Sequence, residues 1–250
     1  MKVVGIIPAR YYSTRFPGKP LSMIKGKTMI HRVCEQAWKS KLDAVVVATD
    51  DMRIAEEVLG FGGKYVLTNP KHPSGTDRCR EALDMLESQY DAVVNIQGDE
   101  PFIDPNQINQ VIDLISRDDT QIVSLAKRIE DEEELFSSNT VKVVMDAKGD
   151  ALYFSRTPIP YMRNVNQKKW LARGCFYKHI GIYAYKADTL HQIAMMPPTA
   201  LETAESLEQL RWIENGLKIC MGITDAENVS VDQPSDIAKA EKFSENQTNI

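Results

Sequence analysis

A loop near the amino terminus carries three cationic side chains around a glycine. Arg10, Arg15 and Lys19 surround Gly18, and the loop follows the apolar run Val3–Ile7. Arginine and lysine bind polyanionic oxygens, and a glycine lets backbone N–H groups approach a ligand closely. A basic loop after the first strand of an α/β sheet therefore predicts a triphosphate site rather than a solvated turn with surface ion pairs. The spacing matches neither a Walker A loop nor the G-x-G-x-x-G motif.

Two aspartates come after later apolar segments. Asp99 follows the run Val93–Ile96, and Asp232 follows a short apolar pair. Because the carboxyl ends of parallel strands meet at one edge of a sheet, we expect Asp99 to face the same crevice as the basic loop. Carboxylates there can hold Mg²⁺ against phosphate oxygens, although Asp99 can also be read as a cap or turn residue. Asp232 alone is more often a turn residue, and its pairing with Asp99 makes it the second metal candidate, ahead of Glu100.

Small polar residues precede a predicted helix in the segment Ser74-Gly75-Thr76. A glycine and hydroxyl groups at a helix start are typical of phosphate or base recognition. A capping segment, with Ser74 or Thr76 as N-cap, explains the pattern equally well. The two interpretations are compatible.

Polar side chains also interrupt segments that are otherwise apolar. The guanidinium group of Arg156 could bind a substrate carboxylate through two parallel N–H bonds. Other residues of this kind could bind hydroxyl groups, although each one alone is more often a satisfied structural group: His179, Tyr183, Glu208 and Gln209.

The composition limits the class of protein. The chain has 250 residues, 43% of them hydrophobic, which predicts one sizeable α/β domain. Its net charge of -5 argues against nucleic acid as the main partner, because a nucleic-acid groove needs a basic surplus. The four cysteines are far apart and form no C-x-x-C pair, as expected for reduced thiols of a cytoplasmic protein. We expect neither a signal peptide nor a membrane insertion, since no apolar run reaches the roughly 20 residues of a span.

Apolar runs alternate with helical patterns in the first half of the chain. Continuously apolar strands are typical of a parallel sheet that is covered on both faces, so the pattern predicts a doubly wound, mostly parallel α/β sheet. The predicted strands are Val3–Ile7, Ala44–Ala48, Tyr65–Leu67, Ala92–Ile96 and Ile122–Ala126, and the predicted helices are Met29–Lys39, Met52–Phe61, Asp77–Ser88 and Pro105–Ser116.

The pattern changes in the second half. We expect a single domain over residues 1–250, with a small β-rich lobe at about 140–200 for substrate binding or dimerisation. Its expected strands, in an antiparallel or mixed insertion, are Val141–Met145, Leu152–Ser155 and Tyr177–Tyr185, with loops at Phe154–Pro160 and Asn164–Arg173. The remaining expectations are a helix at Thr203–Asn215, a strand at Lys218–Gly222, a helix at Ser235–Phe243 and a frayed tail at Ser244–Ile250.

Taken together, the motifs resemble the 3-deoxy-manno-octulosonate (Kdo) cytidylyltransferases, also called CMP-Kdo synthetases. The resemblance runs from residue 3 to about residue 237 and is specific as a combination, since single motifs are shared with other sugar nucleotidyltransferases. The matching segments are Ile7-Pro8-Ala9-Arg10 with Ser13-x-Arg15-x-Pro17-Gly18-Lys19-Pro20-Leu21, Ala48-Thr49-Asp50, Ser74-Gly75-Thr76-Asp77-Arg78, Asn95-Ile96-Gln97-Gly98-Asp99-Glu100-Pro101, Ala151-Leu152-Tyr153-Phe154-Ser155-Arg156, His179-Ile180-Gly181-Ile182-Tyr183 and Leu207-Glu208-Gln209-Leu210-Arg211.

The resemblance implies a Rossmann-like nucleotidyltransferase fold and a reaction. The anomeric hydroxyl of Kdo attacks the α-phosphorus of CTP, and CMP-Kdo forms as pyrophosphate leaves, for lipopolysaccharide biosynthesis. It also implies Mg²⁺ as cofactor, a homodimer, and residue roles. Arg10, Lys19, Asp99 and Asp232 would be catalytic, the two aspartates holding metal. CTP would be bound by Pro8, Ala9, Arg10, Arg15, Lys19, Ser74, Gly75 and Thr76, and the sugar by Gln97, Arg156, His179, Tyr183, Glu208 and Gln209, with Arg156 facing its carboxylate.

The chain departs from the family pattern at few positions. The family usually has Glu where Asp77 stands, and the segment Ser230–Asp236 differs while keeping the metal-binding Asp232. Enzymes that activate 8-amino-Kdo share nearly all of these motifs, so that sugar, or another acid sugar such as a sialic acid, stays an alternative substrate. A catalytically silent nucleotide-binding regulator would be expected to lack Asp99, Asp232 or Lys19, and all three are present.

Overall fold

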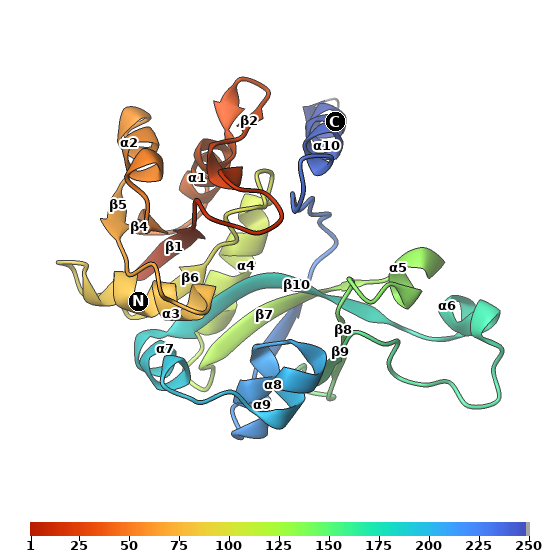
Figure 1. The fold of residues 1–250 in the computed structure, drawn as a ribbon. Helices are drawn as coiled ribbons and strands as arrows, with labels where there is room; N and C mark the ends of the chain where they lie inside the picture. Colours follow the sequence, from red (N-terminus) through yellow and green to blue (C-terminus); the bar gives the residue numbers. More distant parts are fainter. Residues whose placement is uncertain (249–250) are drawn as a thin grey trace.

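A twisted sheet between two layers of helices forms the centre of the protein (Figure 1). The computed structural model describes residues 1–248. The strands are β1 (Val3–Ala9), β2 (Met23–Ile24), β3 (Lys27–Thr28), β4 (Ala44–Thr49), β5 (Tyr65–Leu67), β6 (Ala92–Asn95), β7 (Ile122–Arg128), β8 (Lys142–Met145), β9 (Ala151–Ser155), β10 (Tyr177–Lys186) and β11 (Cys220–Ile223). The α-helices are α1 (Met29–Trp38), α2 (Met52–Gly60), α3 (Gly75–Asp84), α4 (Pro105–Ile115), α5 (Glu132–Phe136), α6 (Trp170–Arg173), α7 (Ala187–Ala194), α8 (Ala200–Glu205), α9 (Gln209–Glu214) and α10 (Asp236–Thr248).

The strand order in the main sheet is β11-β7-β10-β6-β1-β4-β5. Strands β6, β1, β4 and β5 are parallel to one another, and β11 is parallel to β7. The predicted doubly wound, mostly parallel α/β sheet is therefore confirmed, and each predicted strand and helix of the first half has its counterpart.

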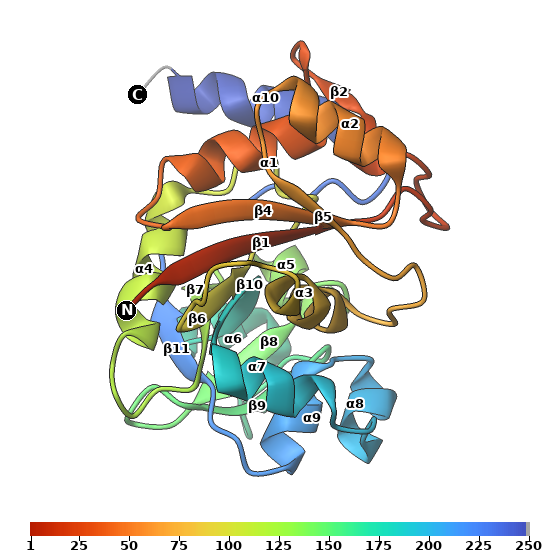
Figure 2. The ribbon, with the colours of Figure 1, turned by 90° about the vertical axis from the view of Figure 1, so that its left-hand side faces the viewer.

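Both faces of the sheet are buried, which explains why its strands are apolar at every position. Val3 and Ile7 of β1 pack with helices α1, α2 and α4, whereas Val4 and Ile6 pack with α3, α7 and α9. Figure 2 shows α1 and α2 on one side of β1 and β4, with α3 on the other side. Capping residues start these helices as expected. Asp104, for example, is the N-cap of α4: it precedes Pro105, and its carboxylate accepts a hydrogen bond from the N–H of Asn106.

Strand β10 corrects one expectation. The segment Tyr177–Tyr185 was expected in the β-rich insertion, but it lies within the main sheet, antiparallel to both β6 and β7. The strand is ten residues long, so its end pairs with β6 while its start also pairs with β8. Strands β8 and β9 extend the sheet as a ribbon beside β10, and α6 lies at the far end of this extension (Figure 1). The division of the chain into a core and a lobe at about 140–200 stays a prediction.

Three further local expectations were wrong. The segment Asn164–Arg173 is not all loop, because it contains the 3-10 turn Gln167–Lys169 and α6, which is anchored by the buried Trp170. The expected helix Thr203–Asn215 is two helices, α8 and α9, because Ser206 adopts a left-handed conformation with φ 53° between them. The expected frayed tail is helical through Thr248, since α10 packs Ala240 and Phe243 beside β2 and α1; residues 249–250 lie outside the described part.

Candidate active site

A cavity of about 290 Å³ opens at the carboxyl ends of β1 and β6. The loop after β1, the segment after β6, the start of α3 and the loop before α10 all contribute to its lining. The predicted site residues that line it are Pro8, Ala9, Arg10, Arg15, Lys19, Gly75, Gln97, Asp99 and Asp232. The basic loop and both candidate metal ligands are therefore brought together at one edge of the sheet, as the sequence predicts.

The basic loop closes on itself through its glycine. Gly18 has φ 71°, a left-handed conformation that side chains disfavour, and its N–H donates to the carbonyl of Tyr11 at 2.8 Å. A Cβ atom at Gly18 would lie 3.3 Å from the Tyr11 ring. On the outer side, the guanidinium of Arg53 lies 3.3 Å from the centroid of that ring, and Arg53 is itself held by Asp51. These contacts fix the turn that presents Lys19 to the cavity.

Lys19 connects the two aspartates. Its Nζ lies 2.8 Å from Oδ2 of Asp99 and 3.8 Å from Oδ1 of Asp232. Arg15 approaches Asp232 from the exposed side, with Nη2 3.2 Å from Oδ1. Two carboxylates and two cations from three distant parts of the chain thus meet at the cavity.

The donor set suits Mg²⁺ when phosphate is present. Among residues 1–248, no group of three or more His, Cys, Asp or Glu side chains is placed to hold a metal ion by itself. Asp99 and Asp232 nevertheless both face a single ammonium group, so they can face a single cation. Mg²⁺ commonly takes one or two carboxylates and completes its shell with phosphate oxygens and water. The residues present fit that arrangement.

Residues that the sequence analysis did not single out also line the cavity. A Cβ atom at Gly98 would lie 2.8 Å from the carbonyl oxygen of Pro8, so only glycine allows the segment after β6 to approach the end of β1. Arg78 is 1% exposed, and its Nη2 lies 3.1 Å from Oδ2 of Asp50. Asn95 is buried at the end of β6, and its Oδ1 has no hydrogen-bond partner among the described residues. A polar residue that ends an apolar strand was the available signal for Asn95.

The segment Ser74-Gly75-Thr76 provides both a helix cap and part of the cavity wall. Ser74 is the N-cap, because its hydroxyl oxygen accepts a hydrogen bond from the N–H of Asp77. Gly75 lines the cavity, whereas the Thr76 hydroxyl donates to Oε2 of Glu208 at 2.8 Å. Burial raises the pKa of Glu208 above its ordinary value. Thr76 therefore links the start of α3 to the residue that precedes α9.

Three of the residues that are predicted to bind the sugar lie on or against β10: Gln97, His179 and Tyr183. Gln97 lies in the cavity and donates from Nε2 to the carbonyl of Gly181 at 2.9 Å. His179 and Tyr183 project from the same face of β10, with ring centroids 5.3 Å apart, and Tyr183 also contacts the Trp212 ring edge-on. Nε2 of His179 lies 2.9 Å from the Ser124 hydroxyl. Gln209 is buried at the start of α9.

Sequence comparisons place these features in a family. Residues 4–219 match the family described as cytidylyltransferase. The chain is 53% identical over 241 residues to the 3-deoxy-manno-octulosonate cytidylyltransferase of Cytophaga hutchinsonii, which covers 96% of each chain. It is 51% identical over 251 residues to the protein of the same name from Bacteroides thetaiotaomicron, covering 99% of this chain and 100% of that one. The chain belongs to the 3-deoxy-manno-octulosonate cytidylyltransferase family.

Solved structures agree with this membership. The fold is similar to that of a CMP:2-keto-3-deoxy-manno-octonic acid synthetase complexed with CTP, with a TM-score of 0.91, 40% identity, and coverage of 99% of this chain and 100% of that chain. A 4-diphosphocytidyl-2C-methyl-D-erythritol synthase from Anaerococcus prevotii shares the fold at 14% identity, with a TM-score of 0.63. The family predicted from the motifs is confirmed, as is the nucleotidyltransferase fold. Among the described residues, every helix is too short or too polar to cross a lipid bilayer.

Arg156 makes contacts that the sequence did not predict. Its guanidinium donates to three backbone carbonyl groups: Nε to Glu205 at 2.7 Å, Nη1 to Ser138 at 3.0 Å and Nη2 to Ser206 at 3.3 Å. Arg156 therefore ties the end of β9 to the turn between α8 and α9. Its contact with the carboxylate of a sugar stays a prediction for this family member.

We expect Arg156→Lys to lower the free energy of unfolding by about 2 kcal/mol, because an ammonium group cannot reach three diverging carbonyls. Urea denaturation measures this loss. Saturation kinetics with the sugar, run beside calorimetric CTP titration, separate the second role: if Arg156 also grips the sugar carboxylate, the sugar KM rises while CTP affinity is kept. Unchanged stability would show that these three bonds contribute little to the fold.

His179 is a half-buried histidine in this cytidylyltransferase. Burial lowers the pKa of His179 from 6.5 to about 3. Between these two pH values the unfolded chain binds a proton that the folded protein excludes, so stability falls as the pH drops below about 6.5. Glu100 acts in the opposite direction, because burial and the charge of Asp99 raise its pKa to about 7.

The variant His179→Gln keeps a polar group near Ser124 but has no side chain that titrates. We expect the variant's unfolding free energy to fall less steeply than the wild type's between pH 6.5 and pH 4, by about one proton in the slope. The contribution of Glu100 is present in both proteins and cancels in the comparison. Urea denaturation at several pH values measures the two slopes. Equal slopes would show that His179 does not titrate on unfolding.

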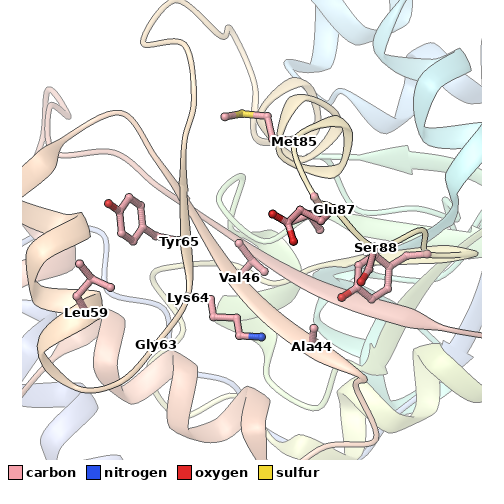
Figure 3. A pocket seen from close by; sticks show the side chains of 11 residues that line it. Ala44, Val46, Leu59, Gly63, Lys64, Tyr65, Met85, Glu87 and Ser88 are labelled. Atoms are coloured by element: carbon pink, nitrogen blue, oxygen red, sulfur yellow. The ribbon is translucent and has the colours of Figure 1, made fainter.

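A second hollow lies at the opposite edge of the sheet (Figure 3). It is bounded by Ala44 and Tyr65 at the starts of β4 and β5, by Leu59 near the end of α2, and by Met85 just after α3. None of the predicted site residues lines it. The residues with a predicted role therefore lie away from this hollow.

Proposed function

We infer that this chain transfers the cytidylyl group of CTP to the anomeric hydroxyl of Kdo, giving CMP-Kdo and pyrophosphate. The observation that carries this inference is the cavity at the carboxyl ends of β1 and β6, where a basic loop meets two carboxylates. The CTP named in the similar solved structure and the names of the full-length relatives support the same substrates.

The reaction forms a bond between the anomeric oxygen and the α-phosphorus and breaks the bond between the α-phosphorus and the bridging oxygen of pyrophosphate. Such a transfer needs positioning and charge neutralisation rather than a covalent nucleophile. Arg10, Arg15 and Lys19 supply positive charge at the cavity, and Gly98 allows close approach of the backbone. Neutral His179 and Gln97 would bind sugar hydroxyl groups from the β10 side.

Magnesium is proposed as the cofactor, held by Asp99 and Asp232 together with phosphate oxygens. When bound, Mg²⁺ would stabilise charge on the phosphates and assist ionisation of the sugar hydroxyl. Lys19 pairs with both carboxylates, and CTP phosphates would attract Lys19 and Arg15 away from them.

We also propose a cytoplasmic homodimer that serves lipopolysaccharide synthesis. The extension of β8, β9 and α6 exposes large apolar side chains, with Leu152 57% and Tyr161 74% exposed, which supports a protein contact there. Light scattering on the purified protein measures its mass in solution.

Pyrophosphate release tests the substrates. The protein is incubated with CTP, Mg²⁺ and either Kdo, 8-amino-Kdo or N-acetylneuraminate, and the product is identified by mass spectrometry. The proposed function requires release with Kdo. Release with 8-amino-Kdo alone would establish the alternative substrate, and nucleotide binding without release from any sugar would favour the silent regulator.

A further inference from the structure

The loop between β11 and α10 carries Asp232, and it is attached to the segment that carries Asp99 at two points. The N–H of Val231 donates to the carbonyl of Asp99 at 2.9 Å. The side chain of Asn228 donates from Nδ2 to Oε2 of Glu100 at 2.8 Å. Two hydrogen bonds therefore join the segments that carry the two candidate metal ligands.

Glu100 accepts one of the two hydrogen bonds that join these segments. Its side chain is buried, with a relative exposure of 8%, although it directly follows Asp99, whose side chain faces the cavity. Burying a carboxyl group without strong compensation is costly, and the amide of Asn228 is the compensation that the structure provides. Oδ1 of Asn228 is also buried and has no hydrogen-bond partner among the described residues. Burying Glu100 and the unpaired Oδ1 of Asn228 therefore lowers the stability of the fold.

Another group of attachments lies at the start of the loop. Lys127 donates from Nζ to the carbonyl of Asp225 at 2.6 Å and pairs with Glu227 at 2.8 Å, while Lys178 lies 3.5 Å from Glu227. These contacts join the loop to β7 and β10 rather than to the segment of Asp99. Past Asn228, the carboxylate of Asp236, the first residue of α10, accepts hydrogen bonds from the N–H groups of Asp232 and Gln233. The contact between Glu100 and Asn228 is a direct side-chain hydrogen bond between the two ligand-bearing segments, beside the apolar packing of Val231 with Phe102.

We propose that Glu100 is a positioning residue which, through Asn228, fixes the position of the Asp232 carboxylate relative to that of Asp99. The inference rests on the proposed function, since it takes these two carboxylates as the pair that holds Mg²⁺. Partners that orient metal ligands typically change metal affinity or activity by roughly 10–100-fold when they are removed. Glu100 and Asn228 do this for a pair of ligands that come from distant parts of the chain.

The test compares Glu100→Ala, Asn228→Ala and Glu100→Gln with the wild type. Gln keeps a side-chain oxygen that can accept from Asn228, whereas Ala does not. Glu227→Gln is the matched control, because it changes a carboxylate of the same loop that pairs with Lys127 and Lys178 instead. Mn²⁺ is titrated into each protein saturated with a non-hydrolysable CTP analogue, with the analogue alone as the blank, and is followed through the EPR signal of free Mn²⁺. The Mg²⁺ concentration for half-maximal pyrophosphate release and the melting temperature are measured in parallel.

We expect both alanine variants to weaken Mn²⁺ binding and to raise the half-maximal Mg²⁺ concentration by roughly 10-fold or more. Glu100→Gln and Glu227→Gln should stay close to the wild type. The double alanine variant should bind Mn²⁺ no more weakly than either single one, because both single changes break the same contact. The CTP KM at saturating Mg²⁺ should change less than the Mg²⁺ dependence.

Three results would overturn the proposal. Alanine variants that melt at lower temperature but bind Mn²⁺ as the wild type does would reduce Glu100 to a structural role. An equal loss in Glu227→Gln would show a general loosening of the loop. A wild-type protein that forms CMP-Kdo but binds no Mn²⁺ would remove the metal pair on which this inference depends, while absence of CMP-Kdo formation together with normal Mn²⁺ binding would overturn the proposed function alone. If Glu100→Ala does not fold, Asn228→Ala decides, since it removes the same hydrogen bond from the other segment.

Discussion

Asp99→Asn and Asp232→Asn are each expected to reduce CMP-sugar formation by roughly 10³-fold or more while the protein stays folded. Both carboxylates face the cavity and the ammonium group of Lys19, so each supplies negative charge where a metal would bind. Losing a metal-binding carboxylate removes several kcal/mol of transition-state stabilisation, and each 1.4 kcal/mol is about tenfold in rate. Asparagine keeps the shape of the side chain, so the change acts on charge rather than on packing.

The measurement is pyrophosphate release with CTP, Kdo and Mg²⁺, with circular dichroism to establish folding. Asp113→Asn is the matched control, because Asp113 pairs with Lys41 on the outer surface of α4, far from the cavity. It should retain the wild-type rate. A near wild-type rate for Asp99→Asn or Asp232→Asn would remove that residue from the metal site.

Lys19→Ala and Arg10→Ala are expected to impair the use of CTP by roughly 10–100-fold in kcat/KM, and the use of the sugar much less. Both side chains line the cavity on the basic loop, and a charge-assisted hydrogen bond is worth about 1.5–3 kcal/mol. Lys19 also lies within 4 Å of both aspartates, so it offsets their mutual repulsion. Its removal leaves their repulsion uncompensated until a metal binds.

Steady-state kinetics with each substrate varied in turn separate the two effects. Lys41→Ala serves as a control, since Lys41 is an exposed lysine that pairs only across the surface with Asp113. Equal losses in kcat/KM for CTP and for the sugar would contradict the assignment of Lys19 and Arg10 to the phosphates.

The parts of the fold that depend on local pattern could be predicted from the sequence. Continuous apolar runs such as Val3–Ile7 and Ala44–Ala48 have that pattern because helices cover both faces of the sheet. The meeting of Lys19 with Asp99 was also predictable, because the loop and the aspartate both follow strands whose carboxyl ends share one edge.

Features decided by tertiary contacts could not be predicted. An apolar run such as Tyr177–Tyr185 has the same pattern whether it pairs in parallel or antiparallel fashion, so its place between β6 and β7 was not visible. The break between α8 and α9 occurs at Ser206 rather than at glycine or proline, and no local signal marked it. The hydrogen bonds of the Arg156 guanidinium to backbone carbonyls, one of them that of Ser206 at this break, were likewise not predicted.

Strand β10 has a consequence for how the chain is assembled during synthesis. Strands β6 and β7 are successive members of the main sheet along the chain, yet each of them bonds to β10, which is made about fifty residues after β7 begins. In a growing polypeptide that has not reached residue 177, β6 therefore lacks its partner on one side, and β7 lacks both of its partners, β10 and β11. Open edges are where foreign strands add and where chains exchange segments. The interval before β10 emerges is thus the stage at which nascent chains most need protection from one another.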